Sequence, residues 1–395
     1  MNEIILQKQK QAIEILKEQN IDMWLTFVRE SASIHDPVLD TIAGVNVTWQ
    51  SAFILTASGE RKAILGSLDI ANLKDAGTFD DITGYVQSIR EPLREFVQKH
   101  DPKTIAVNFS KNMNLADGLT YGLYQILLDH FNGTPYGERL VSSENIVSAL
   151  RGRKSPDELK IMREAVIITL EIFDEVGKFI TKGKTEKEIA QFMTERTQAR
   201  GLTVAWEADS CPAVFTGPDT AGAHAGPTDR KVEGGHLINI DFGVNYKGYC
   251  SDLQRTWYIL KDDETDAPAE VKRGFEVLKT SITKAAEALK PGIKGVYVDA
   301  AARGHITANG FDEYPHGLGH QVGRVAHDAG PGLFPAWEKY GDLPFIPLEK
   351  DQVFTIEPRL FVPGHGIVTI EEEVVLTDTG IDWLSQRQEE LMLLR

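Results

Sequence analysis

The sequence is poor in cysteine, has fewer basic than acidic residues and contains no long apolar run. Two cysteines, Cys211 and Cys250, are too few for a disulfide framework in a chain of 395 residues, and their small or apolar neighbours favour buried free thiols. The 42 Lys and Arg against 58 Asp and Glu give a formal net charge of -16, which repels nucleic acid and anionic membranes. Because no segment resembles a signal peptide or a membrane span, we expect a cytoplasmic protein with no nucleic-acid or membrane partner.

A chain of this length is expected to form two domains, which we place at residues 1–150 and 151–395. A basic, turn-prone stretch, LRGRKSP, lies at this boundary, and Asp157 and Glu158 follow it in the first turn of a long helical pattern. Strand-like runs in the first domain alternate with helical patterns, the first of which spans 3–19. The strand-like runs lie at 23–28, 51–56 and 104–109. This alternation predicts a small α/β domain.

No chemical motif stands out in the first domain. Its adjacent polar residues, His35 and Asp36, are better explained by a solvated loop or a cap than by a site.

The second domain mixes long helical patterns with strand pairs, which predicts an α+β arrangement. The expected helices lie at about 156–178, 185–200, 267–289 and 296–309, and the expected strands at about 236–242, 248–259, 352–361 and 367–376. Two hairpins among these strands each carry a pair of acids.

In the first hairpin, Asp241 and Asp252 lie at equal distances from a turn centred between Tyr246 and Lys247. Equal distances predict that the two carboxylates face each other on one side of the ladder. In the second hairpin, the midpoint between Glu357 and Glu371 falls in the Pro/Gly turn VPGHG, which predicts a second cross-strand pair.

Facing acids within apolar strands require compensation. Like charges directly opposite in a sheet are destabilising, and a buried carboxylate without a partner is more costly still. The two pairs therefore predict a cation between them. The alternative is that each acid points to solvent and that the symmetry about both turns is a coincidence.

Three histidines, His316, His320 and His327, lie in the glycine-punctuated stretch HGLGHQVGRVAHDAG. A single histidine is more often structural, but three within twelve residues, with glycines that permit close backbone approach, favour a site. Carboxylates with one imidazole form an oxygen-rich ligand set that suits Mn²⁺, Co²⁺, Fe²⁺ or Zn²⁺. Five ligands exceed the need of one divalent ion, whereas two ions sharing carboxylates would use them all.

The motifs IDFGVNYKGYCSDLQRT, HGLGHQVGRVAHD, FTIEPRLFV and IVTIEEEVVLT together resemble those of the pita-bread (M24-type) metallopeptidases. Within that family the sequence is most similar to Xaa-Pro aminopeptidases and prolidases, over about residues 157–390. The preceding α/β domain resembles the creatinase-type N-terminal domain. The resemblance implies a curved antiparallel sheet flanked by helices, with an internal pseudo-twofold.

The resemblance also implies a role for each site residue. Asp241 would chelate one ion, Asp252 and Glu371 would bridge the pair, and His320 would bind the other ion. Glu357 would ligate that ion and handle the proton of the attacking water. The histidines expected to contact the substrate are His224, His316 and His327. Such histidines agree with the need for positioned donors near a peptide oxyanion.

The sequence departs from the family pattern at two places. Thr369 stands where the family carries an arginine, and Arg255 is one candidate to replace it, although a solvated or structural role fits Arg255 equally well. The stretch 330–350 is longer than in compact members, so we expect a loop over the pocket. Trp337 and Tyr340 could pack there against a proline ring, or could simply hold a surface loop in place. Arg324 is a candidate receptor for a substrate carboxylate.

These features predict hydrolysis of Xaa-Pro bonds at the N-terminus of peptides or in dipeptides, with two divalent ions, Mn²⁺ foremost, and a homodimeric enzyme. One rival is a hydrolase on the same scaffold with a non-peptide substrate, either creatinase-like or a phosphoester, because fold does not determine function. A second rival is a non-catalytic pita-bread binding module, which typically lacks some of the ligands that this sequence retains.

Overall fold

The structure is a computed structural model that describes residues 2–220 and 226–395. The chain divides into two compact units, Met1–Ser155 and Pro156–Arg395. The boundary expected near residue 150 lies inside helix α6 (Glu144–Gly152). In the described part of the chain, no helix is both long and apolar enough to cross a membrane.

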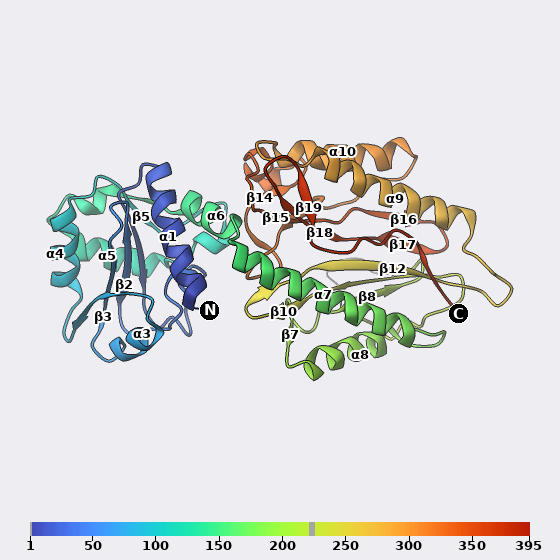
Figure 1. Cartoon of the computed structure of the whole chain (residues 1–395), viewed down its shortest axis with the longest axis horizontal. Coiled ribbons are helices and arrows are strands. Elements are labelled where there is room, and N and C mark those ends of the chain that lie inside the picture. The colour runs from blue at the N-terminus through green and yellow to red at the C-terminus, as the bar shows by residue number, and fades with distance from the viewer. Residues whose placement is uncertain (1, 221–225) are drawn as a thin grey trace. The chain divides into compact units, whose positions relative to one another are not determined.

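The N-terminal unit is built on a six-stranded mixed sheet in the order β4-β3-β2-β1-β5-β6 (Figure 1). The strands are β1 (Met23–Val28), β2 (Ser51–Thr56), β3 (Arg61–Gly66), β4 (Asp81–Tyr85), β5 (Ile105–Val107) and β6 (Leu140–Ser142). Besides α6, the helices are α1 (Asn2–Glu18), α2 (Leu39–Ile42), α3 (Ile70–Ala76), α4 (Arg90–His100) and α5 (Tyr121–Phe131). Strand residues such as Leu25 and Ile54 pack against Leu93 of α4 and Leu127 of α5 in one core. The expected α/β domain is confirmed.

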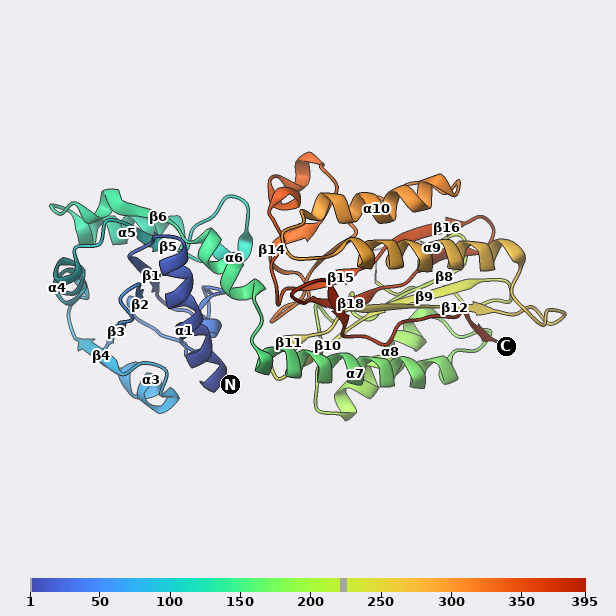
Figure 2. The same ribbon diagram turned by 45° about the horizontal axis from the view of Figure 1, so that its top comes forward.

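Four long helices frame the C-terminal unit. They are α7 (Pro156–Phe179), α8 (Glu186–Ala199), α9 (Ala269–Ala288) and α10 (Gly295–Ala308). Figures 1 and 2 show the strands of this unit between α7 and α8 on one side and α9 and α10 on the other. Each helix lies where the 3.6-residue pattern predicted it, because each presents one apolar stripe to the sheets.

The described strands of this unit form four sheets with the orders β11-β10-β7, β20-β12-β9-β8, β14-β13-β15-β18-β19 and β16-β17. The strands of the first half are β7 (Thr203–Val204), β8 (Ala213–Thr216), β9 (Leu237–Phe242), β10 (Val244–Tyr246), β11 (Tyr249–Cys250) and β12 (Leu253–Ile259). Those of the second half are β13 (Gly319–Gln321), β14 (Asp328–Leu333), β15 (Val353–Ile356), β16 (Arg359–Val362), β17 (Gly366–Thr369), β18 (Glu372–Leu376), β19 (Ile381–Trp383) and β20 (Met392–Leu394).

Three strands that we expected to be continuous are each divided in two. The breaks fall at Asp252 between β11 and β12, at Glu357 between β15 and β16, and at Glu371 between β17 and β18. At the last two breaks the chain passes between the five-stranded sheet and the β16–β17 pair. A hydrophobicity pattern does not reveal such a change of sheet, because the alternation of faces continues through it.

The face of the second hairpin is set by the core of this unit. Even-numbered residues, including Ile356, Leu360 and Ile370, are buried in one cluster with Leu278 of α9 and Val298 of α10. Successive strand residues point to opposite faces, so the odd-numbered residues lie on the side away from this core. Glu357 and Glu371 are therefore directed away from the helices α9 and α10.

Candidate metal centre

The five predicted ligands come from both halves of the C-terminal unit. Asp241 lies in β9 and Asp252 directly before β12, whereas His320 lies in β13. Glu357 and Glu371 lie at the two breaks of the second hairpin. A bridge between Gln254 and Glu371 joins the two hairpins, so strands far apart in the sequence meet at this point.

The register of the first hairpin differs from our prediction. Asp241 faces Gln254, and Asp252 lies diagonally two residues away on the same side of the ladder. The turn is centred one residue later than predicted, on Lys247 and Gly248, which both have positive φ, 51° and 80°. Positive φ at both central residues is the requirement of a two-residue hairpin turn, and a glycine satisfies it readily. The two carboxylates share a face, as expected, but they are not directly opposite.

The second hairpin has the predicted register. The pairs Ile356 with Glu372 and Arg359 with Thr369 belong to one continuous alignment, in which position 357 is opposite position 371. The Pro/Gly turn therefore identified the midpoint correctly.

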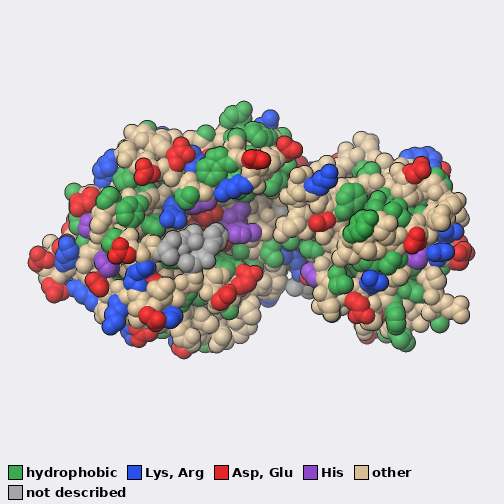
Figure 3. Space-filling model, turned by 180° about the vertical axis from the view of Figure 1, so that it is seen from behind, with side chains coloured by type: hydrophobic (Ala, Val, Ile, Leu, Met, Phe, Trp, Pro, Cys, Tyr) green, Lys and Arg blue, Asp and Glu red, His purple; other side chains and the backbone are tan. Residues whose placement is uncertain are grey.

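The side chains of these residues form three overlapping groups whose ligand atoms lie within 4.8 Å of one another. The groups are Asp252–His320–His327, His320–Glu357–Glu371 and Asp241–Asp252–Glu371. Nε2 of His320 lies 3.3 Å from Oε1 of Glu357 and 3.7 Å from Oδ2 of Asp252. All five predicted ligands are thus brought together. Figure 3 shows histidine and acidic side chains together in a hollow of this unit.

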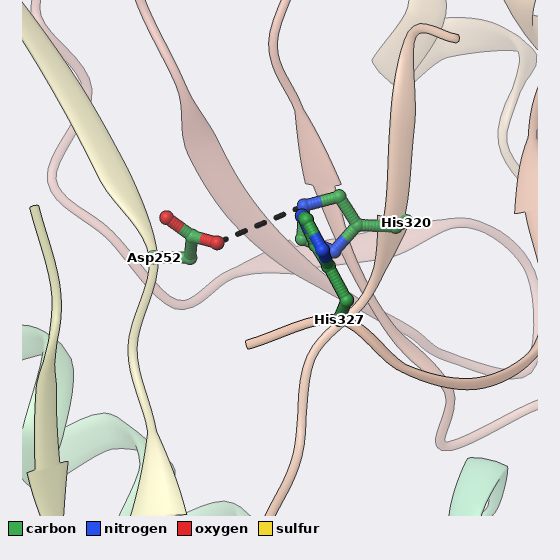
Figure 4. A group of neighbouring side chains, drawn as sticks. All are labelled: Asp252, His320 and His327. Carbon is green, nitrogen blue, oxygen red and sulfur yellow. Dashed lines mark ion pairs between the residues drawn. The ribbon is translucent and has the colours of Figure 1, made fainter. Parts of the chain in front are cut away.

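His327 lies closer to the acids than its predicted role required. Its ring is 4.2 Å from that of His320 between centroids, with the planes nearly perpendicular (Figure 4). The resemblance alone selected His320 as the ligand, whereas the geometry also allows a nitrogen of His327 to share an ion with Asp252.

Burial controls the protonation of this cluster. Burial raises the pKa of Asp241 to about 7, against a smaller lowering by its hydrogen bond with Asp252. Burial also raises the pKa values of Asp252, Glu357 and Glu371 well above the usual range, and for these three the neighbouring carboxylates add to the effect. Burial, with His327 nearby, lowers the pKa of His320 to about 3. A neutral imidazole beside crowded carboxylates is the state that binds a cation, and the cation's charge would offset the repulsion.

The hydrogen bonding of the acids provides a test of whether they fit a metal. Within residues 2–220 and 226–395, Oδ1 of Asp241 and both carboxylate oxygens of Glu371 are buried without a hydrogen-bond partner. Glu371 is 1% exposed. Buried polar atoms in native proteins are almost always paired, so these oxygens fit divalent cations as their missing partners.

The cluster of predicted ligands is also contacted by three polar residues that were not predicted from the sequence. Thr355 Oγ1 accepts a hydrogen bond from the backbone N–H of His320 at 3.1 Å and donates to Oε1 of Glu357 at 3.4 Å. Gln254 Nε2 donates to Oε2 of Glu357 at 3.4 Å, and the backbone N–H of Asp252 donates to Oε1 of Glu373 at 2.6 Å. Each lies two positions from a predicted ligand on the same face, a spacing that could have identified them.

The remaining predicted residues have other surroundings. Nδ1 of His316 lies 2.8 Å from the backbone oxygen of Gly317. The guanidinium of Arg324 lies 5.4 Å over the Tyr249 ring. His224 lies outside the described residues. Arg255 donates to the backbone oxygen of Glu371 at 2.9 Å and pairs with Glu372 at 3.0 Å, so it fixes the backbone of Glu371.

Trp337 and Tyr340 belong to a compact aromatic cluster. The Tyr340 ring stacks on Phe334 with centroids 4.3 Å apart, and Trp337 lies 6.0 Å from Tyr340. The Tyr340 hydroxyl accepts a hydrogen bond from the backbone N–H of Gly317 at 2.9 Å.

Comparison with known proteins gives a consistent result. The profile of metallopeptidase family M24 matches residues 160–378. The "Uncharacterized peptidase YqhT" of Bacillus subtilis (strain 168) is 30% identical over 282 residues, 70% of this chain and 73% of that protein. An X-Pro aminopeptidase from Thermotoga maritima MSB8 superposes with a TM-score of 0.74 at 25% identity, over 98% of this chain and 99% of that one. An Xaa-Pro dipeptidase from Bacillus anthracis has the same fold, with a TM-score of 0.77 at 23% identity over 99% and 100% of the two chains.

More than half of the chain matches the family profile. The solved structures extend the similarity of fold to nearly the whole chain, including the N-terminal unit. The chain therefore belongs to metallopeptidase family M24.

Proposed function

We propose that this metallopeptidase hydrolyses the bond between an N-terminal residue and proline, in peptides or in dipeptides, with two divalent ions. The observation that carries the metal dependence is the set of buried, unpartnered oxygens of Asp241 and Glu371 beside His320. The preference for proline is supported by the solved structures of similar fold, which are described as Xaa-Pro dipeptidases, X-Pro aminopeptidases and prolidases.

Asp241, Asp252, His320, Glu357 and Glu371 would hold the ions. Asp252, Glu371 and His320 each belong to two of the three side-chain groups. Of these three, only the two carboxylates have two oxygens that can each bind an ion, which supports a bridging role for Asp252 and Glu371. When bound, the ions supply an activated water and polarise the scissile carbonyl. Mn²⁺ is the ion that we expect first, because the donor set is rich in oxygen.

The residues of this chain would manage the protons. An Xaa-Pro bond has a tertiary amide nitrogen with no N–H, and this nitrogen must gain a proton to leave as proline. Glu357 can accept the proton of the attacking water at a carboxylate oxygen and deliver it to that nitrogen. His316, His327 and His224 are the proposed donors to the carbonyl oxygen as its negative charge develops.

A peptide panel tests this proposal. The purified protein is stripped with a chelator and then assayed, with and without Mn²⁺, on Xaa-Pro dipeptides, Xaa-Pro-Yaa tripeptides and proline-free controls. We expect cleavage only with the ion and only before proline, and the ratio of dipeptide to tripeptide turnover identifies the subclass. Asp378→Asn serves as a control, because this exposed acid pairs with Lys350 away from the five predicted ligands, and its substitution should leave the activity unchanged.

Three results would contradict the proposal. Equal turnover of proline-free peptides would remove the proline preference. Bound ions without any peptide cleavage would favour a non-peptide substrate, and phosphotriesters are the first to try. Failure to bind divalent ions, measured by elemental analysis, would favour a binding module. The expected homodimer and the cytoplasmic location are separate predictions.

A further inference from the structure

A buried ion pair in α10 is bound to the loop that carries His316. Arg303 and Asp299 form two parallel hydrogen bonds, from Nε and from one terminal nitrogen, each 2.8 Å long. Asp299 is 1% and Arg303 8% exposed. A buried ion pair is by itself weak evidence for stability, since desolvation offsets much of its attraction. What it offers is a fixed orientation of donors and acceptors.

The ion pair directs its remaining hydrogen-bonding atoms to the backbone of residues 314–318. Arg303 donates to the backbone oxygens of Tyr314 at 2.7 Å and His316 at 2.8 Å. Asp299 Oδ1 accepts a hydrogen bond from the backbone N–H of Leu318 at 3.1 Å. One ion pair therefore fixes both ends of the segment His316–Leu318.

Tyr340 holds the middle of the same segment. Its hydroxyl accepts from the N–H of Gly317, between the two residues that the ion pair contacts. Two glycines make room for the Phe334 ring that stacks on Tyr340. A Cβ added to Gly317 would lie 2.3 Å from a carbon of the Phe334 ring, and a Cβ added to Gly332 would lie 2.1 Å from one. The Arg303 guanidinium lies 5.0 Å from the Trp337 ring centroid, so the ion pair and the aromatic cluster touch.

The segment that is held in this way leads directly to two predicted ligands. The backbone oxygen of Leu318 accepts the N–H of Glu357 at 2.8 Å. Gly319 follows, and a Cβ there would lie 2.0 Å from the backbone oxygen of Thr355, so β13 packs on β15 at closest approach just before His320. A shift of residues 316–318 would thus be transmitted to His316, His320 and Glu357 together.

We propose that Asp299, Arg303 and Tyr340 form one clamp on the backbone of His316–Leu318 and are positioning residues for the metal centre. Tyr340, with Trp337 stacked beside it, acts through this clamp and does not contact the substrate. The proposal rests on the proposed function only for its kinetic consequences, since its effect on ion binding is independent of the substrate.

The test uses the full-length protein with the substitutions Tyr340→Phe and Arg303→Lys, singly and together. Tyr340→Phe removes only the hydroxyl, and Arg303→Lys keeps the charge but loses the planar fork. The controls are Tyr297→Phe and Glu338→Gln. Tyr297 is an exposed tyrosine of α10, the helix that carries Arg303, and Glu338 is an exposed residue two positions before Tyr340. The measurements are the Kd for Mn²⁺ by calorimetry, kcat and KM on the best Xaa-Pro substrate, and Tm.

We expect each single substitution to weaken Mn²⁺ binding by about 10-fold, the scale for losing an outer contact of a metal site. The double variant should be little worse than either single one, because residues that act as a unit are not additive. The value of kcat should fall while KM stays within a factor of about two for dipeptides and tripeptides alike.

Other outcomes would overturn the clamp. A rise in KM alone for Tyr340→Phe would make it a substrate contact. A lower Tm with unchanged Mn²⁺ affinity and kcat would make the cluster purely structural. If the loss of Mn²⁺ affinity in the double variant equalled the sum of the two single losses, Arg303 and Tyr340 would position the segment independently. If the wild-type enzyme cleaves no Xaa-Pro bond, the Mn²⁺ affinities still decide the question, so failure of the clamp and failure of the proposed function are distinguishable.

Discussion

The two units of the chain each bury a carboxylate but surround it differently. Asp36 in the N-terminal unit is 0% exposed, and its two oxygens accept hydrogen bonds from the N–H of Val38 and from Asn108 Nδ2, both at 2.9 Å. Glu371 in the C-terminal unit is as deeply buried, and among the described residues neither of its oxygens has a hydrogen-bond partner. The hydrogen bonds of the first carboxylate are complete, whereas the oxygens of the second fit a cation as their missing partner.

The environment of Asp36 is a closed polar network. Asn108 also accepts a hydrogen bond from Trp24 Nε1 at 2.8 Å and from Ser143 Oγ at 2.8 Å. Burial raises the pKa of Asp36, and the bonds from Asn108 and Val38 partly oppose that rise. At Glu371 the neighbouring carboxylates increase the rise further. A buried acid therefore indicates a ligand site only where its hydrogen bonds are missing.

The largest effect should come from neutralising Glu371. The substitution Glu371→Gln removes a charge that the ions require, so we expect Mn²⁺ affinity and kcat/KM to fall by more than about 100-fold. The metal-free variant should not lose stability, because a source of repulsion is gone. Calorimetric titration with Mn²⁺ and thermal unfolding check both statements. Wild-type affinity in this variant would remove Glu371 from the ligand set.

The second effect is a pH dependence that the ion should abolish. Burial raises the folded-state pKa of Asp241 from its ordinary value of 3.8 to about 7. A raised pKa stabilises the fold at low pH, and this contribution is lost as the pH rises through the folded value. We expect the Tm of the metal-free protein to fall by several degrees between pH 5 and pH 8 relative to the Mn²⁺-loaded protein. If Tm changed with pH in the same way for the metal-free and the Mn²⁺-loaded protein, bound cations would not be offsetting the repulsion among the carboxylates.

A smaller effect is expected in the N-terminal unit. Asp36→Asn places an amide N–H₂ where the carboxylate now accepts two hydrogen bonds, which should cost about 1–3 kcal/mol of unfolding free energy. The matched control is Asp40→Asn, because the side chain of Asp40 is half exposed. Chemical denaturation measures the cost, and Mn²⁺ affinity should stay at the wild-type value. A loss of Mn²⁺ affinity would show that the two carboxylates are not independent.

The smallest effect should come from Thr355→Val. The hydrogen bond from its hydroxyl to Glu357 is long, 3.4 Å, and therefore weak. We expect its loss to lower Mn²⁺ affinity by about 10-fold at most. Thr369→Val is the matched control on the same face, since the Thr369 hydroxyl has no hydrogen-bond partner in the described part of the chain. Equal effects of both substitutions on calorimetric Mn²⁺ affinity would show that packing, not the hydroxyl of Thr355, matters.

Local patterns in the sequence were sufficient to predict much of the architecture. The helices α7 to α10 and the strands β1 and β2 lie where periodicity placed them, because each buries one face. Turn chemistry predicted the second hairpin correctly and the first one wrongly, since Lys247 adopts a positive φ that a lysine rarely takes. The sequence predicts a solvated loop or a cap at Asp36. Its carboxylate does accept the N–H of Val38, but the residue is fully buried, because Asn108 supplies the second hydrogen bond that solvent would otherwise provide.

The family and the candidate ligands could be predicted from the sequence alone, because both are carried by short motifs whose residues lie close together in the chain. Which side chains come into contact depends on the tertiary structure. Gln254, Thr355 and Glu373 contact residues of the candidate metal centre. His327 approaches His320, and Tyr340 accepts a hydrogen bond from the backbone N–H of Gly317. The two-residue spacing along a strand can suggest which side chains share a face, but the partner that each side chain meets depends on packing in three dimensions.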